Sequence, residues 1–408
     1  MVMRLKELNL LKWLGTIFLV LAFLSCSDKD DPTPEPEENN LVEASVTGTW
    51  PVAQLKLLIQ LSGQDIDPNL LQYDVDIYKV TYKTAYKDSE IHASGLVLLP
   101  RTTGTAMPMI GFQHGTIVKQ ADAPSVQQKE SEQVTSYSAL ASMGFITVVP
   151  DMIGFGASKD IFHPYYVEEP TARAVTDMLH AAVALAKEKQ LQFDSRVFLA
   201  GYSQGGYGTL ATHKALEAEP QEGFEVIASF PGAGGYDVKA MQDYLFGLST
   251  YSDPYYIAYV AMSYESYYGN DNIVDNFFDE PYASKIPTLF DGFNSGSQIN
   301  EQLVDKVPAL MKDDVLQNIN TDPKYQFLRE DFQENSLVDW APSAPVYFYH
   351  GDADITVPLE NTQLTYDKLI SNGASPDDIH IVVFPGGDHN TSVAPYIVAV
   401  VKKLQELK

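Results

Sequence analysis

The chain has 408 residues, with 45% hydrophobic and 20% charged side chains and a formal net charge of −27 at pH 7. This length and hydrophobic share predict a large core with an appended subdomain. The acidic balance argues against nucleic acid as a partner, because phosphate binding needs clustered Lys and Arg. The single cysteine, Cys26, excludes an intrachain disulfide, and the sequence contains no metal-ligand spacing and no internal repeat.

Residues 1–25 have the pattern of an export signal. A positively charged leader precedes an apolar run of about a dozen residues, 13–24. This run suits the hydrophobic region of a signal peptide and falls short of the roughly twenty residues of a membrane span. It ends in the sequence FLSC, residues 23–26, which resembles a bacterial lipobox, so Cys26 is predicted to be lipidated. The alternative is an ordinary secretory signal with an incidental cysteine.

Residues 26–43 are acidic and rich in proline. They predict a disordered tether, because such a segment cannot bury apolar surface. Acidic residues directly after Cys26 also resemble the surface-export signal of some Gram-negative outer-membrane lipoproteins. We therefore expect an exported protein held to a membrane by its N-terminal lipid, at the outer membrane and its outer surface.

Strand and helix patterns alternate after the tether. A helix is predicted at 51–61 and an antiparallel strand pair at 74–85 and 91–99. Further along, the expected elements are a strand at 107–112, a helix at 130–143, a strand at 145–149, a helix at 171–189, and strands at 197–200, 224–230, 344–351 and 380–384. These intervals predict an α/β fold with a doubly wound, mostly parallel sheet. Its core would comprise residues 44–237 and 341–408.

The most informative stretch joins the strand at 197–200 to the following helix. It reads Gly201-Tyr202-Ser203-Gln204-Gly205, the G-x-S-x-G pattern of a nucleophile elbow. The strand must reverse sharply into the helix, which holds Ser203 in a strained conformation with its oxygen exposed. Only glycine at the two flanking positions lets the backbones pass so closely. The alternative is a glycine-rich turn without chemistry.

A serine nucleophile needs a base and an orienting acid, in the chain order Ser, Asp or Glu, His. Asp352 and Asp354 follow one late strand, and His389 follows the next. Ligand sites of open α/β sheets lie at the carboxyl ends of the strands. The predicted catalytic residues are therefore Ser203, Asp354 and His389, with Asp352 as an alternative acid.

Two backbone N–H groups are predicted to form an oxyanion hole. The first belongs to Gln204, directly after the nucleophile. The second belongs to Thr116, in the loop 113–116 at the end of an early strand. The His114 imidazole is interpreted as a hydrogen-bonding group of this loop and a pocket residue rather than as a catalyst.

The alternation breaks over residues 238–340, a length far beyond that of ordinary loops. This insertion is rich in tyrosine and phenylalanine and has stretches with helical spacing. We interpret it as a helical cap over Ser203; the alternative is a subdomain at the side of the core, away from the site. The predicted substrate-pocket residues are His114, Tyr202, Tyr255 and Tyr256.

The chain resembles the α/β-hydrolases, and among them the secretory lipases of lipase-A type, over most of residues 70–405. The resemblance rests on the loops 113–116 and 151–156, the elbow, the cap, and the loops of Asp354 and His389. It implies hydrolysis of acyl esters with a deep tunnel under the cap. Such a mechanism requires no cofactor and no metal.

Three functions fit these patterns. The first is a surface-tethered carboxylesterase or lipase that acts on small-molecule or lipid esters. The second keeps the same catalytic residues in a glycan esterase that removes acetyl or feruloyl groups, or in a serine peptidase. The third is a non-catalytic binding lipoprotein, which the set of Ser203, Asp354 and His389 disfavours. The sequence carries no prediction of the oligomeric state.

Overall fold

The computed structural model describes residues 40–102, 104–270 and 272–408. The expected signal peptide, Cys26 and most of the tether lie outside these ranges. Strand β1 begins at Leu41 and takes up residues 41–43, which the sequence analysis had assigned to the tether. Within the described ranges, no helix has the length and apolar character needed to cross a membrane.

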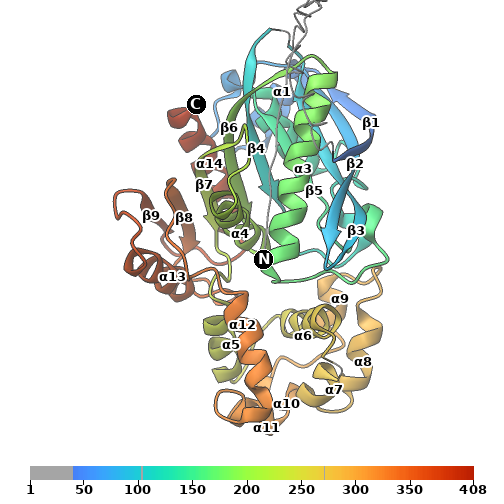
Figure 1. Cartoon of the computed structure of the whole chain (residues 1–408), viewed down its shortest axis with the longest axis vertical. Helices are drawn as coiled ribbons and strands as arrows, with labels where there is room; N and C mark the ends of the chain where they lie inside the picture. Colours follow the sequence, from blue (N-terminus) through green and yellow to red (C-terminus); the bar gives the residue numbers. More distant parts are fainter. Residues whose placement is uncertain (1–39, 103, 271) are drawn as a thin grey trace, which may run out of the picture. The chain divides into compact units, whose positions relative to one another are not determined.

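Nine strands form one sheet in the order β1-β2-β3-β5-β4-β6-β7-β8-β9 (Figure 1). The strands are β1 (Leu41–Trp50), β2 (Val75–Tyr86), β3 (Ser89–Pro100), β4 (Ala106–Gln113), β5 (Ile146–Pro150), β6 (Gln192–Tyr202), β7 (Glu225–Gly232), β8 (Val346–Gly351) and β9 (Ile379–Phe384). The pairs β1–β2, β2–β3 and β3–β5 are antiparallel, and every pair from β5 to β9 is parallel. The predicted α/β fold with a mostly parallel sheet is confirmed.

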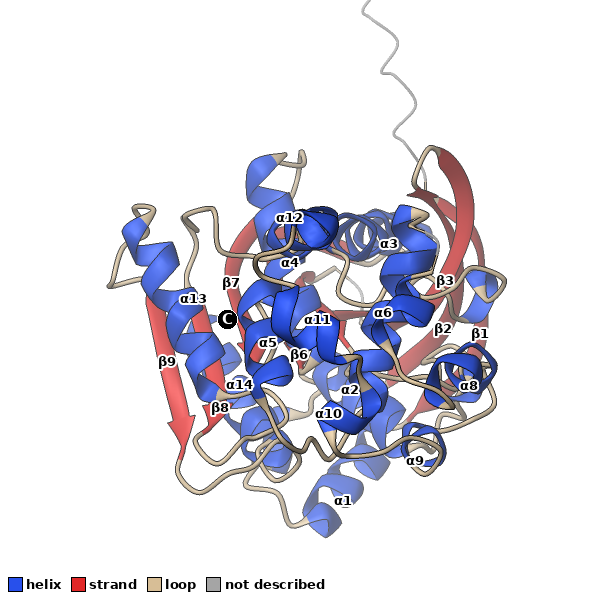
Figure 2. Ribbon diagram, turned by 90° about the horizontal axis from the view of Figure 1, so that it is seen from below, coloured by secondary structure: helices blue, strands red, loops and turns tan. Residues whose placement is uncertain are grey.

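Helices cover both faces of the sheet (Figure 2). They are α1 (Val52–Ser62), α2 (Glu132–Ser142), α3 (Glu168–Glu188), α4 (Gln204–Ala218), α13 (Leu359–Ser371) and α14 (Val393–Leu407). Helices α1, α2 and α14 share one apolar cluster with the strands, and α3 packs on the opposite face in a second cluster. The central parallel strands are therefore buried on both sides, as such strands require.

Within the described residues, eight α-helices lie between β7 and β8 and form the inserted segment, which we call the cap (Figure 1). They are α5 (Val238–Gly247), α6 (Tyr255–Tyr268), α7 (Ile273–Phe277), α8 (Tyr282–Leu289), α9 (Gly296–Asn300), α10 (Val307–Leu310), α11 (Asp313–Asn318) and α12 (Gln326–Glu334). Short 3-10 turns lie at Pro68–Leu70, Gln120–Asp122, Gly156–Ser158 and Pro323–Tyr325.

The cap packs on the core through buried apolar side chains. Tyr264, Phe277 and Phe332 of the cap belong to the same cluster as Tyr207 and Leu210 of helix α4. Helix α4 starts directly after Ser203, so this cluster fixes the cap beside the elbow.

Candidate active site

Ser203 lies at the sharp turn between β6 and α4. Its backbone has φ 60° and ψ −124°, a conformation that L-residues rarely adopt. Its N–H donates a 2.8 Å hydrogen bond to the carbonyl of Gly232 on β7. A Cβ at Gly201 would lie 2.4 Å from the Gly205 oxygen, and one at Gly205 would lie 2.0 Å from the Gln113 oxygen. Both flanking positions therefore require glycine for close backbone approach.

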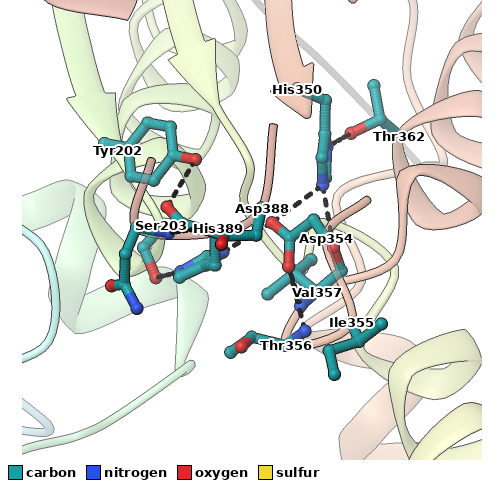
Figure 3. Close-up of polar contacts among 12 residues, drawn as sticks. Tyr202, Ser203, His350, Asp354, Ile355, Thr356, Val357, Thr362, Asp388 and His389 are labelled. Carbon is teal, nitrogen blue, oxygen red and sulfur yellow. Dashed lines mark hydrogen bonds and ion pairs between the residues drawn. The ribbon is translucent and has the colours of Figure 1, made fainter. Parts of the chain in front are cut away.

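Three side chains from separate loops form a line of hydrogen bonds (Figure 3). Ser203 Oγ lies 2.9 Å from His389 Nε2, and His389 Nδ1 lies 2.6 Å from Asp354 Oδ2. The carboxylate accepts the Nδ1–H, so Nε2 is left to accept the serine hydroxyl. His389 and Asp354 are buried, whereas Ser203 is partly exposed. This arrangement can move a proton from the serine to the imidazole.

Neighbouring groups hold Asp354 in its ionised form. The backbone N–H groups of Thr356 and Val357 each donate to Asp354 Oδ1 at 2.9 Å. His350 Nε2 lies 3.4 Å from Asp354 Oδ2. Burial by itself raises the pKa of Asp354, but the hydrogen bonds from His350, His389 and Val357 outweigh it and lower the pKa to about 2.

Asp352, the alternative acid, lies elsewhere. Its side chain is exposed, and its Oδ1 accepts a 2.6 Å hydrogen bond from the N–H of Gly386. This bond joins the loops after β8 and β9. The structure therefore brings Asp354, and not Asp352, against His389.

Two tyrosines of the cap reach the loop that carries Asp354. The Tyr244 hydroxyl donates to the carbonyl of Ile355 at 3.0 Å, and the Tyr251 hydroxyl donates to the carbonyl of Thr356 at 3.3 Å. The position of the acid loop thus depends on contacts with the cap as well as with the sheet.

The loop after β4 passes beside Ser203. A Cβ at Gly115 would lie 3.9 Å from Ser203 Cβ. Within the described residues, the Thr116 N–H donates to no acceptor, while Thr116 Oγ1 lies 2.8 Å from the Tyr165 hydroxyl. His114 is buried, with its ring nitrogens 2.7 Å from the Gly115 oxygen and 3.2 Å from the Asp151 oxygen. Its contacts are those of the loop-supporting residue expected from the sequence.

His163 is a residue of this site that the sequence analysis did not identify. Its Nδ1 donates to the carbonyl of Ile153 at 2.6 Å, and its Nε2 accepts a 2.5 Å hydrogen bond from the Gln204 side-chain amide. Burial lowers the pKa of His163 to about 4, so the ring is neutral at pH 7. It lies in a loop without a motif, and its partner is 41 positions away. No local sequence signal could have indicated it.

Two cavities meet at Ser203. An apolar cavity of about 90 Å³, lined by Ser203 and residues of α5, α6, α7 and α12, lies under the cap. A groove of about 650 Å³ is lined by Ser203, Thr116 and His389 and by residues of α1, α2 and α14. Tyr256 lines both, so one cap tyrosine stands at their junction.

The other expected pocket residues have different positions. Tyr202 and His114 line the 650 Å³ groove, and the Tyr202 hydroxyl donates to the His389 carbonyl at 2.9 Å. Tyr255 lines neither cavity: it is buried against Tyr256 and beside Gly296. It therefore supports Tyr256 rather than facing Ser203. Within the described ranges, no group of three His, Cys, Asp or Glu side chains is placed to hold a metal ion.

In the α/β-hydrolases, a strained serine lies between a strand and a helix of a parallel sheet, and an acid and a histidine lie on later loops. This chain has the same arrangement. Residues 132–247, which include the elbow, match the model of the prolyl oligopeptidase family. The match and the structural similarities below establish the α/β-hydrolase fold, and the protein is a hydrolase of this type.

Several solved structures share this fold. A Legionella pneumophila protein described as a hydrolase is 26% identical, with a TM-score of 0.80 over 90% of this chain and 98% of that one. The rice cell wall degrading esterase LipA of Xanthomonas oryzae is 24% identical, with a TM-score of 0.78 over 91% and 100%. Candida antarctica lipase A in its closed state is 15% identical, with a TM-score of 0.66 over 91% and 83%. No curated protein sequence matches the chain.

Proposed function

We propose that the protein hydrolyses carboxylic esters. Ser203 Oγ attacks the ester carbonyl while His389 Nε2 takes its proton, and the resulting oxyanion is held by the N–H groups of Gln204 and Thr116. The carbonyl then re-forms, the acyl C–O bond breaks, and the proton passes from His389 to the departing alcohol. A water molecule then attacks the acyl carbon while His389 Nε2 takes its proton; the bond from the acyl carbon to Ser203 Oγ breaks, and the proton passes to Ser203 Oγ as the carboxylic acid leaves. Asp354 fixes the tautomer of His389 and stabilises the imidazolium.

The observation that carries this proposal is the line of hydrogen bonds from Ser203 through His389 to Asp354, opening on an apolar cavity. A binding protein has no need of a strained serine in contact with a histidine whose carboxylate partner is ionised. The similarity to an esterase of Xanthomonas and a lipase of Candida supports ester bonds as the target.

The acyl group is assigned to the cavity under the cap. Tyrosine and phenylalanine rings offer large apolar area with few rotatable bonds, and this cavity is lined almost entirely by apolar and aromatic side chains. Burial is worth about 0.8 kcal/mol per methylene. Specificity should therefore rise from acetyl towards longer acyl groups and level off where the cavity is full.

Removal of acyl groups from cell-wall glycans is the second candidate, favoured by the similarity to the rice cell wall degrading esterase. Peptide hydrolysis is the third, favoured by the match of residues 132–247 to the prolyl oligopeptidase family. Either would use the same serine, histidine and aspartate.

A substrate panel separates these candidates. Nitrophenyl esters from acetyl to palmitoyl, an acetylated glycan, a feruloylated glycan and a peptide amide would be compared by kcat/KM. If the protein is a carboxylesterase or lipase with its acyl site under the cap, kcat/KM should be higher for butyryl and longer nitrophenyl esters than for the acetyl ester. A preference for acetyl over butyryl and octanoyl esters would place the glycan esterase first. Cleavage of the amide alone would place the peptidase first.

The location is also a proposal. The leader, the FLSC sequence and the acidic tether support acylation of Cys26 and anchoring at the outer membrane, with the hydrolase on the outer surface. A single acyl chain binds membranes only marginally, so we infer that the mature cysteine carries more than one.

A further inference from the structure

Only one of the two cavities at Ser203 includes the proposed base. His389 and Asn390 line the 650 Å³ groove, together with Thr116 of the proposed oxyanion hole. The cavity under the cap is lined by Ser203 but by none of these three residues. The two halves of a bound ester would thus meet different surroundings.

The mechanism decides which half enters which cavity. When the acyl C–O bond breaks, His389 Nε2–H must give its proton to the alkoxide oxygen, so that oxygen has to lie within hydrogen-bond reach of the ring. The alcohol therefore extends into the space that His389 lines, and the acyl chain occupies the other.

More than half of the residues that line the groove have apolar or aromatic side chains. Ile59 of α1, Leu140 of α2 and Val401 of α14 line it and are buried, as are the loop residues Leu71 and Met143. Polar side chains that line the groove and are exposed or half-buried are Thr116, Ser203 and Asn390 and, further from the site, Gln64, Glu132, Gln133 and Ser136. Figure 2 shows α1, α2 and α14 together on one side of the sheet.

The two cavities also differ in volume. The groove, at about 650 Å³, is several times larger than the cavity of about 90 Å³ under the cap. Methanol or ethanol would leave most of the groove to water, which finds no hydrogen-bond partner on the isoleucine, leucine and valine side chains. An alkyl chain placed there would be removed from water at every added methylene.

We propose that this groove is the alcohol subsite, and that the protein acts on esters in which an extended hydrophobic alcohol is the larger half. The inference rests on the proposed ester hydrolysis, and it adds a second specificity that is independent of the acyl group. The occupant is the alkyl body of the alcohol, with any further hydroxyl groups at the polar rim.

The test holds the acyl group constant and varies the alcohol. Ethyl, butyl and hexyl butyrate have leaving groups of similar basicity, so differences in kcat/KM report binding in the groove. Each buried methylene can raise kcat/KM by up to about fourfold. We expect at least a tenfold rise from ethyl to hexyl butyrate in the full-length protein.

Two variants narrow the groove. Ala394 is an exposed residue in the first turn of α14, and Ser136 is a half-buried residue of α2; both line the groove. Ala394→Trp and, independently, Ser136→Trp should reduce the hexyl-to-ethyl ratio to below about threefold. Lys402→Trp is the matched control. Lys402 lies on the same helix, does not line the groove, and pairs with Asp65 at the surface, so it should keep the wild-type ratio.

The outcomes separate the inference from the proposed function. A tenfold rise that either tryptophan flattens, and that Lys402→Trp retains, supports the alcohol subsite. Ser203-dependent hydrolysis of ethyl butyrate without any rise overturns the subsite and leaves the esterase intact. A rise that persists in both groove variants, each folded by circular dichroism, also overturns it, because the alcohol then binds elsewhere. Failure to hydrolyse any ester would contradict both the alcohol subsite and the proposed ester hydrolysis.

Discussion

The side-chain amide of Gln204 donates a 2.5 Å hydrogen bond to Nε2 of His163. Gln204 directly follows Ser203, the proposed nucleophile, and its backbone N–H is the proposed first oxyanion donor. The ring that holds its side chain therefore also steadies the first residue of α4. His163 lines neither of the two cavities at Ser203, so it acts on the site through Gln204 as a positioning residue.

Loss of this hydrogen bond should slow the chemical step. His163→Phe keeps the aromatic contacts with Phe155 and Tyr259 but has no acceptor for Gln204. Removal of a whole oxyanion donor lowers kcat by about 10²–10³-fold. A less firmly held Gln204 N–H should therefore lower kcat by about tenfold and leave KM nearly constant. His163→Gln, which offers an acceptor, should recover most of the loss. Steady-state kinetics with nitrophenyl butyrate measures this, and an unchanged kcat in His163→Phe would contradict it.

The same histidine should make stability depend on pH. The folded pKa of His163 is about 4, below its ordinary value of 6.5, because burial disfavours the charged ring and His114 lies nearby. Between these two pH values the unfolded chain binds more protons, so the free energy of unfolding falls as the pH falls. The expected loss is about 2 kcal/mol between pH 6.5 and 5. Urea unfolding at pH 6.5 and at pH 5 measures this. Over that range the free energy of unfolding should fall by about 2 kcal/mol less in His163→Phe than in the wild-type protein.

Ser203→Ala should reduce ester hydrolysis by roughly 10⁴-fold or more with the fold intact. His389→Ala should cost nearly as much, and the double variant little more, because the two residues act as a unit. Initial rates and a thermal melt of each variant would test this. A Ser203→Ala protein that retains a tenth of wild-type turnover would rule out the assigned nucleophile.

Substitution of Asp354 and substitution of Asp352 should have very different effects on kcat. Asp354→Asn replaces the acceptor of the His389 Nδ1–H and favours the wrong tautomer, so kcat should fall by about 10³–10⁴-fold. Asp352→Asn keeps an oxygen for the Gly386 N–H and should change kcat less than about threefold. Parallel kinetics on the two isosteric variants decides between them. Equal losses would mean that the acid has been misassigned.

Cys26→Ser should release the protein from the membrane fraction, since the proposed lipid is the anchor. Cells labelled with radioactive palmitate would be fractionated, and the wild-type protein compared with the variant by immunoblot. Continued labelling and membrane fractionation of the variant would exclude acylation at this cysteine.

Local features were predictable from the sequence. The elbow was predictable because the G-x-S-x-G motif specifies a local backbone geometry. The strained φ of Ser203 and the close backbone approach at Gly201 and Gly205 depend on five adjacent residues. Central parallel strands such as β4 and β6 were found because burial on both faces produces continuous apolar runs. Strand β1 was not predicted as a strand, since it lies at the sheet edge, is largely exposed and has two irregularities in register with β2.

Contacts between distant residues were not predictable. Tyr255 and Tyr256 are adjacent and chemically identical, yet only Tyr256 reaches the cavities. Their difference depends on how α6 packs against the core, which a sequence pattern does not contain. The helices α13 and α14 were also not anticipated, although α14 supplies one wall of the groove.

The hydroxyl groups of Tyr244 and Tyr251 connect the cap to the peptide groups that surround the Asp354 carboxylate. Both cap tyrosines donate to carbonyls of the loop whose neighbouring amides, at Thr356 and Val357, keep the Asp354 carboxylate charged. Tyr244 and Tyr251 precede Ile355 and Thr356 by more than a hundred positions. A distant segment of the chain therefore helps to position the carboxylate that accepts the His389 Nδ1–H.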